Sequence, residues 1–264
     1  MIELNKIYQE NCFDTMKRID KVDLVLTSPP YNTARSNCDF YNDTNKSRYS
    51  KRYEDFNDMK TDEEYIQWTV DLFNAFDKIL ARDGAVCYNI SYGGEKPWLM
   101  WNVMSQIQMQ TKFRIADCIV WKKKSALPNN VSPNKLTRIC EFVFVLCRES
   151  EMATFYCNKG INSTSEKGQT IYNNVFNYID APNNDETCPI HKATYSSLLC
   201  RKLIDLYCPP QSQSVVYDPF MGTGTTAIAC IREKRNYIGS ELSERYCQWA
   251  ENRIKIETSQ LTLF

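Results

Sequence analysis

The sequence contains few of the residues that most metal sites need. It has a single histidine, His191, and none of its 12 cysteines forms a C-x-x-C pair. The spacing of Cys140 and Cys147 does not match a zinc knuckle either. We therefore expect no metal site, and we expect most cysteines to be small buried side chains in a reducing compartment.

Long apolar segments are also missing. The apolar runs are only strand-sized, which excludes a transmembrane helix, and the opening "MIELNKIYQENC" lacks the pattern of a signal peptide. The composition is ordinary for a globular protein, with 43% hydrophobic and 24% charged residues among 264. These features predict a soluble cytoplasmic protein without a membrane partner, long enough for one large domain or two small ones.

The sequence shows no excess of charge, since Lys plus Arg and Asp plus Glu both number 32. A basic face can still exist, and "NKSRYSKRY" (45–53) and "WKKKSALP" (121–128) place aromatic residues beside basic ones. Such segments can bind phosphates and stack on bases, or they can be solvated charged loops. The candidate phosphate contacts are Lys46, Arg48, Lys51, Arg52, Lys122, Lys123 and Lys124.

Strand-like and helix-like segments alternate along most of the chain. Short apolar runs predict strands at 22–28, 85–91, 114–121, 140–147, 214–220 and 235–242. Helical spacing predicts helices at 62–80, 97–110, about 194–207, 222–234 and 243–257. Ser243 is a plausible N-cap for the last helix. This alternation predicts an α/β protein whose parallel-rich sheet carries helices on both faces.

Residues 149–190 lose this alternation and are rich in Asn, Ser, Thr, Lys and Tyr. The composition suits an irregular recognition segment, or else a tolerated surface loop. We expect one catalytic domain with this insert rather than two independent domains. Residues 1–148 would form its catalytic half and residues 191–264 its cofactor-binding half.

The segment "VVYDPFMGTGTTAIA" (215–229) predicts a strand, a glycine turn and a helix start, where backbone can approach a ligand closely. No lysine follows the glycines, which excludes a P-loop, and Gly222 and Gly224 lack the third glycine of a dinucleotide site. Asp218 suits a cationic ligand, and Glu241 at the end of the next strand suits ribose hydroxyls. Together they indicate S-adenosylmethionine, although a tight turn and a helix-entry acid would explain each feature separately.

The segment "TSPPYN" (27–32) ends an apolar run with two prolines and an aromatic ring. The exocyclic amine of cytosine or adenine is a poor nucleophile, and acceptors around its N–H groups would help it react. Ser28 Oγ and the Pro29 carbonyl, held at a fixed φ, can each accept one amine hydrogen. Tyr31 can stack on a base turned out of the duplex. The leaving group is a neutral thioether, so positioning should carry most of the catalysis without a general acid or metal.

The pairing of "TSPPYN" with "DPFMGTGTT" resembles the amino-group DNA methyltransferases, which make N6-methyladenine or N4-methylcytosine. The family's catalytic motif, (Asp/Asn/Ser)-Pro-Pro-(Tyr/Phe), matches Ser28, Pro29, Pro30 and Tyr31. The catalytic motif precedes the glycine motif, with a variable segment between them, which is similar to the family's beta group. The resemblance implies a Rossmann-like methyltransferase sheet with circularly permuted motif order.

Two further segments extend the resemblance over most of the chain. "KIYQENCFDTMKRI" resembles the motif that lines the adenine pocket, with Asn11 in place of the usual acid. "CPIHKATYSSLLCRKLI" resembles the segment His-Pro-Ala-x-Phe-Pro, with Lys192 and Ser196 where prolines are usual, and a solvated loop is the alternative for its histidine. The cofactor-binding residues implied are Asn11, Cys12, His191, Ala193, Thr194, Asp218, Pro219, Phe220, Gly222, Thr223, Gly224, Thr225 and Glu241.

The first position of the motif favours one target base, although the chemistry alone does not force the choice. Serine there most often accompanies N4-cytosine methylation in the family, so Ser28 favours cytosine, with N6-adenine as the alternative. Cytosine C5 methylation is disfavoured because the chain has no Pro-Cys pair. A DNA-binding module with a vestigial cofactor site and a Rossmann dehydrogenase fit the motifs less well.

The resemblance also implies partners. These are double-stranded DNA, a cognate restriction endonuclease acting in the same restriction–modification system, and a possible homodimer. We expect residues 149–190 to read the target sequence, because direct readout needs side chains inside a groove. The polar, tyrosine-rich residues 33–58 are expected to order over the flipped base.

Overall fold

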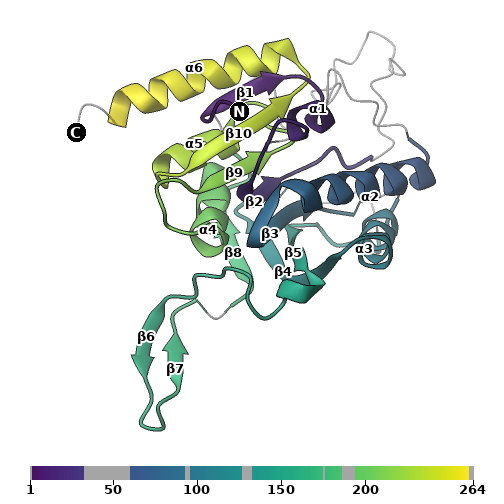
Figure 1. Cartoon of the computed structure of the whole chain (residues 1–264). Coiled ribbons are helices and arrows are strands. Elements are labelled where there is room, and N and C mark those ends of the chain that lie inside the picture. The colour runs from purple at the N-terminus through teal and green to yellow at the C-terminus, as the bar shows by residue number, and fades with distance from the viewer. Residues whose placement is uncertain are drawn as a thin grey trace.

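The computed structural model describes residues 2–32, 60–92, 96–126, 133–174, 176–185 and 194–261. Within these ranges, an eight-stranded sheet runs through the molecule in the order β1-β10-β9-β2-β3-β5-β4-β8 (Figure 1). Its strands are β1 (Lys6–Gln9), β2 (Val22–Thr27), β3 (Leu80–Ile90), β4 (Phe113–Lys123), β5 (Cys140–Arg148), β8 (Tyr178–Ala181), β9 (Val215–Asp218) and β10 (Asn236–Glu241).

The five strands from β1 to β3 pair in parallel, and β5 then pairs antiparallel with both β3 and β4. Strands β2 and β9 are apolar along almost their whole length and are buried on both faces. That pattern is typical of parallel strands covered by helices on each side.

Helices cover both faces of the sheet (Figure 1). One face packs against α1 (Cys12–Met16), α2 (Asp62–Ile79) and α3 (Leu99–Gln110), and the other against α4 (Ser197–Tyr207), α5 (Thr225–Arg232) and α6 (Glu244–Leu261). Each face has its own buried apolar cluster, with Phe73 and Ile107 in the first and Leu203 and Ala227 in the second. The predicted α/β class, with a parallel-rich sheet and helices on both faces, is confirmed.

Helix α2 shows how local sequence sets an element's bounds. Thr61 and Glu64 form a reciprocal capping box at its start. The helix ends at Ile79 because Leu80 already belongs to β3, which pairs with β2. Residues 81–84, which separate the predicted helix at 62–80 from the predicted strand at 85–91, lie inside β3, where Asp83 has φ 60° and the register with β2 shifts. The chain bends there without leaving the sheet.

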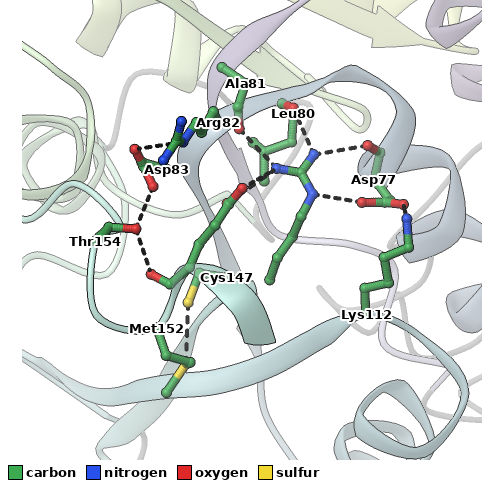
Figure 2. Close-up of polar contacts among 11 residues, drawn as sticks. Asp77, Leu80, Ala81, Arg82, Asp83, Lys112, Cys147, Met152 and Thr154 are labelled. Atoms are coloured by element: carbon green, nitrogen blue, oxygen red, sulfur yellow. Dashed lines mark hydrogen bonds and ion pairs between the residues drawn. The ribbon is translucent and has the colours of Figure 1, made fainter.

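A partly buried cation, Arg148, joins α2, β3 and β5. Arg148 donates a 2.6 Å hydrogen bond to Asp77 and a 2.7 Å bond to the Leu80 carbonyl, while Lys112 lies 2.7 Å from Asp77. Figure 2 shows this junction, with Asp77 facing Lys112 on one side and Asp83 facing Thr154 on the other. Burial opposes ionisation of Asp77, but the two cations outweigh it and lower its pKa.

The described part of residues 149–190, which ends at residue 185 and omits residue 175, is more regular than the sequence predicted. A short helical turn, η1 (Glu149–Glu151), leads to β6 (Ile161–Thr164) and β7 (Thr170–Tyr172), an antiparallel hairpin that projects from the body in Figure 1. Strand β8 then joins the main sheet beside β4. Its four residues, with Ile179 and Ala181 buried, are too few for a periodic pattern to be recognised.

Most of the described cysteines behave as the small apolar side chains that the sequence predicted. Seven of them are buried: Cys12, Cys87, Cys147, Cys200, Cys208, Cys230 and Cys247. In the described part of the chain, no helix has the length and apolar character to cross a membrane.

Candidate active site and cofactor cavity

The candidate site lies where the strand order reverses. From β9 the chain continues to β10 on one side of the sheet, and from β2 it continues to β3 on the other. Ligands of open α/β sheets bind beyond the carboxyl ends of the strands at such a point. The two strand ends are joined by a 2.8 Å hydrogen bond from Thr27 Oγ1 to Asp218 Oδ1.

A cavity of about 360 Å³ opens at this point, within the size range typical of small-molecule sites. It brings together eleven residues predicted from the sequence, although they come from distant segments. These are Asn11, Cys12, Ser28, Pro30, Thr194, Pro219, Phe220, Gly222, Thr223, Thr225 and Glu241.

Not every predicted site residue lines the cavity. Of the described ones, Pro29, Tyr31, Asp218, Gly224 and the three lysines Lys122, Lys123 and Lys124 are not among its lining residues. Six more fall outside the described residues, namely Lys46, Arg48, Lys51, Arg52, His191 and Ala193.

The glycine turn owes its shape to two positions in the left-handed region. Gly222 has φ 53° and Gly224 has φ 85°, where side chains are strained. A Cβ on Gly224 would also lie 2.9 Å from the Ala250 Cβ in α6. From the same helix Arg253 donates a 2.7 Å hydrogen bond to the Thr223 carbonyl. The turn is therefore packed directly on α6, which holds its backbone at the cavity wall.

Glu241 ends β10 and links the turn to the next helix. Its two carboxylate oxygens accept hydrogen bonds from the Gly222 and Ser243 backbone N–H groups, at 2.8 and 2.9 Å. Burial raises the pKa of Glu241, and the backbone donors oppose that shift. The carboxylate is thus fixed at the cavity with lone pairs remaining for a ligand.

Asp218 has a different position from the one expected for a ligand-binding acid. Its side chain is fully buried and accepts hydrogen bonds from the hydroxyls of Thr27, Tyr195 and Thr226 and from the Phe220 N–H. Burial raises its pKa, while these donors favour the charged form. The geometry makes Asp218 a buried anchor that joins β2, β9 and α5.

The opening motif contributes Asn11 and Cys12 to the cavity lining. Asn11 is the N-cap of α1, and its side chain accepts a 3.0 Å hydrogen bond from the Phe13 N–H. The Cys12 carbonyl accepts a hydrogen bond from the buried Tyr217 hydroxyl at 3.2 Å. The first contact caps the helix, and the second fixes its backbone against the sheet.

The Ser-Pro-Pro-Tyr segment begins directly after β2. Ser28 lines the cavity, and the Pro30 carbonyl accepts a 2.6 Å hydrogen bond from the buried Tyr65 hydroxyl of α2. Tyr31 turns its hydroxyl away from the glycine turn, toward Ser28 at 3.1 Å, Asn89 at 3.0 Å and Glu141 at 3.2 Å. The segment is therefore held at the second proline's carbonyl and at the tyrosine hydroxyl.

The three adjacent lysines do not share one environment. Strand β4 continues to Lys123, so two of them lie in the sheet and not after it. Lys122 lies 3.6 Å from Asp180, and Lys123 pairs with Glu141 while lying 4.8 Å from the Trp121 ring centroid. Lys124 follows the strand and is exposed.

Several cavity residues were not predicted from the sequence. Trp68 reaches the cavity from α2 and packs on Phe220, with ring centroids 5.5 Å apart. Its helical spacing gave no means of telling it from a core residue. The other missed residues are Glu10, Phe13, Lys60, Tyr195, Met221, Leu242, Ser243 and Tyr246.

No metal centre accompanies this cavity in the described residues. Among them, no group of three or more His, Cys, Asp or Glu side chains is arranged to hold a metal ion.

Comparison with known proteins finds similarity to DNA methyltransferases in each case. A family model described as DNA methylase, for N6 and N4 methyltransferases, matches residues 22–252. The chain is 24% identical to Type II methyltransferase M.Cfr9I of Citrobacter freundii over 301 residues, covering 98% of this chain and 91% of that protein. It is 26% identical to Type II methyltransferase M.SmaI of Serratia marcescens over 268 residues, covering 88% and 84%.

Solved structures share the fold. The crystal structure of the M1.HpyAVI–SAM complex superposes with a TM-score of 0.62 at 23% identity, covering 94% of this chain and 98% of that one. The PvuII DNA methyltransferase, named as cytosine-N4-specific, superposes with a TM-score of 0.68 at 17% identity, covering 94% and 85%.

Proposed function

We propose that this chain, which belongs to the DNA methylase family of N6 and N4 methyltransferases, transfers a methyl group from S-adenosylmethionine to the N4 amine of cytosine in DNA. The observation that carries the proposal is that Ser28 lines the same cavity as the glycine turn and Glu241. An acceptor for an amine and a site for an adenosyl ligand therefore share one enclosed space. The PvuII fold relative, named as cytosine-N4-specific, supports the choice of base.

The residues present fit S-adenosylmethionine. Aromatic rings of Phe13, Phe220 and Tyr246 line the cavity and can enclose an adenine, while the Glu241 carboxylate can accept from ribose hydroxyls. The fold relative M1.HpyAVI, which was crystallised as a complex with SAM, supports the same cofactor. When bound, S-adenosylmethionine supplies an activated methyl group on a sulfonium.

The chain's own residues prepare the amine. Ser28 Oγ can accept one N–H of the exocyclic amine, and the Pro29 carbonyl is held beside it by a rigid dipeptide. The bond from Tyr65 to the Pro30 carbonyl keeps this loop in place. Such positioning of the amine toward the cavity would carry most of the rate enhancement.

We further propose that residues 149–190 recognise the target within double-stranded DNA. The projecting β6–β7 hairpin supports this assignment, because a two-stranded ribbon fits the major groove.

The rest of the proposal concerns the organisation of the chain and its partners. Residues 1–148 and 191–264 form the catalytic and cofactor-binding halves. The order of catalytic and glycine motifs supports a place in the beta group. The Type II names of the relatives support action in the cytoplasm within a restriction–modification system, with a cognate endonuclease. A homodimer is part of the proposal.

The function can be tested with labelled S-adenosylmethionine. Purified protein is incubated with duplex DNA of mixed sequence, the DNA is digested, and the nucleosides are separated. We expect label in N4-methyl-2′-deoxycytidine, and none with Ser28→Ala. Label in N6-methyl-2′-deoxyadenosine would show that the base assignment is wrong, and no label in nucleic acid would refute the methyltransferase proposal itself.

A further inference from the structure

Polar side chains of β3, β4 and β5 form a hydrogen-bonded network with Tyr31, next to Ser28. The Tyr31 hydroxyl lies 3.1 Å from Ser28 Oγ, 3.0 Å from Asn89 Oδ1 at the end of β3, and 3.2 Å from Glu141 Oε2 at the start of β5. Glu141 also accepts a hydrogen bond from Lys123 of β4 through its other oxygen. Neither Asn89 nor Glu141 was assigned a role from the sequence.

The direction of these hydrogen bonds follows from counting protons. Asn89 Nδ2 donates a 3.0 Å bond to the Phe142 carbonyl, which fixes the amide so that Oδ1 faces Tyr31. The carboxylate of Glu141, paired with Lys123, has no proton to give. Both groups facing Tyr31 therefore accept, and the single tyrosine proton points to them.

This arrangement determines what Ser28 can do. Because the Tyr31 proton is used on the Glu141 and Asn89 side, the contact between Ser28 and Tyr31 is satisfied when Ser28 donates to the tyrosine oxygen. The serine proton then points away from the cavity that Ser28 lines. Its oxygen lone pairs remain toward the cavity, where an amine N–H can donate.

The charge of Glu141 adds to this orientation. Its side chain is 18% exposed and that of Lys123 is 23% exposed, so solvent screens the pair only in part. A hydrogen bond to a carboxylate is stronger than one between neutral groups, and linked hydrogen bonds polarise one another. The Glu141 carboxylate therefore polarises the Ser28 oxygen through the Tyr31 hydroxyl, although Glu141 itself does not line the cavity.

We propose that Glu141 is a positioning residue which, through the Tyr31 hydroxyl, orients and polarises Ser28 as the acceptor for the target amine. The inference rests on the proposed methyltransferase function. It explains how a neutral serine can take a place where related motifs carry an aspartate. The competing explanation is that Glu141 only ties β5 to β4 through its ion pair with Lys123.

The test combines Tyr31→Phe, Glu141→Gln and the double variant. Tyr31→Phe removes one oxygen and keeps the ring, while Glu141→Gln keeps the size of the side chain. We expect each to lower kcat by about 10- to 100-fold, the range expected for losing a hydrogen bond to a charged group. KM for S-adenosylmethionine and for DNA should change less than about twofold, since the acceptor acts mainly on the reacting amine. The double variant should be no slower than Tyr31→Phe, because Glu141 acts through that hydroxyl.

A matched control is Arg114→Gln, which breaks the 2.8 Å ion pair with Glu149 at the other end of β4 and should leave kcat unchanged. A Glu141→Gln enzyme as fast as wild type, or losses that multiply in the double variant, would overturn the inference. If Glu141→Gln does not fold, an unchanged kcat in Tyr31→Phe overturns it alone. A wild-type protein that methylates no DNA would overturn the proposed function, and the inference with it.

Discussion

Thr27 and Asp218 are 191 residues apart in the chain, yet Thr27 Oγ1 donates a 2.8 Å hydrogen bond to Asp218 Oδ1 in the interior. Both side chains are fully buried at adjacent carboxyl ends, Thr27 on β2 and Asp218 on β9. One bond therefore joins the strand that leads to Ser28 with the strand that leads to the glycine turn. This bond adds to the direct pairing of β2 with β9 in holding the two halves of the cavity together.

Replacing Thr27 with valine should destabilise the protein and weaken cofactor binding. The substitution keeps the shape but removes one donor from a buried carboxylate, at a cost of about 1–3 kcal/mol. Urea unfolding measures the change in free energy, and calorimetric titration measures S-adenosylmethionine affinity. Thr258→Val on the exposed face of α6 is the control, expected within about 0.5 kcal/mol of wild type. Equal stability of the two variants would contradict the role of the Thr27–Asp218 bond.

Gly224→Ala should lower both stability and cofactor affinity. The left-handed φ costs an alanine roughly 1–2 kcal/mol, and the new Cβ would lie 2.9 Å from that of Ala250. Gly168→Ala in the β6–β7 hairpin is a matched control, since its φ is 75° but nothing lies within 4 Å of the added Cβ. We expect Gly224→Ala to be the less stable variant, and only it to bind the cofactor poorly. Normal cofactor affinity in Gly224→Ala would show that the turn tolerates displacement.

Cofactor binding should weaken on acidification because of Glu241. Burial raises the pKa of this carboxyl above its ordinary value, so protonation begins at a higher pH than for an exposed glutamate. The protonated form loses acceptor capacity, and affinity should therefore fall as pH falls through the raised pKa. Calorimetric titration from pH 8 to pH 5 measures this. Glu241→Gln should bind weakly with little pH dependence, whereas the exposed Glu244→Gln should behave as wild type; a wild-type pH profile in Glu241→Gln would assign the titration to another group.

Tyr31→Ala should retain cofactor binding and lose most methyl transfer. Tyr31 is not among the residues lining the cavity, but it directly follows Pro30, which is. Loss of base stacking is worth about 1–3 kcal/mol, or roughly 10- to 100-fold in rate. Equilibrium binding and single-turnover methylation separate the two effects. A collapse of cofactor affinity would place Tyr31 in support of the cofactor instead of the base.

The local sequence was sufficient to predict most of the longer helices and strands. The helical spacing of apolar residues over 62–80 predicted α2 (Asp62–Ile79) to within one residue. The run "CEFVFVLC" identifies β5 in the same way. The four-residue β8 was missed, because its place is decided by pairing with β4 and not by its own pattern. The bend at Asp83 was not recognised as part of a strand for the same reason: it stays in β3 through pairing with β2, where the register shifts.

The sequence by itself determined most of the longer helices and strands, the glycine turn and the Ser-Pro-Pro-Tyr segment, because backbone conformation and periodicity depend on near neighbours. Only the tertiary structure decided which distant groups meet. It placed Asp218 in the interior, away from the cavity wall, and it brought Glu141 to the hydroxyl of Tyr31 across 110 residues. Such contacts follow from the order of strands in the sheet, which sets which strand ends are adjacent whatever their separation along the chain.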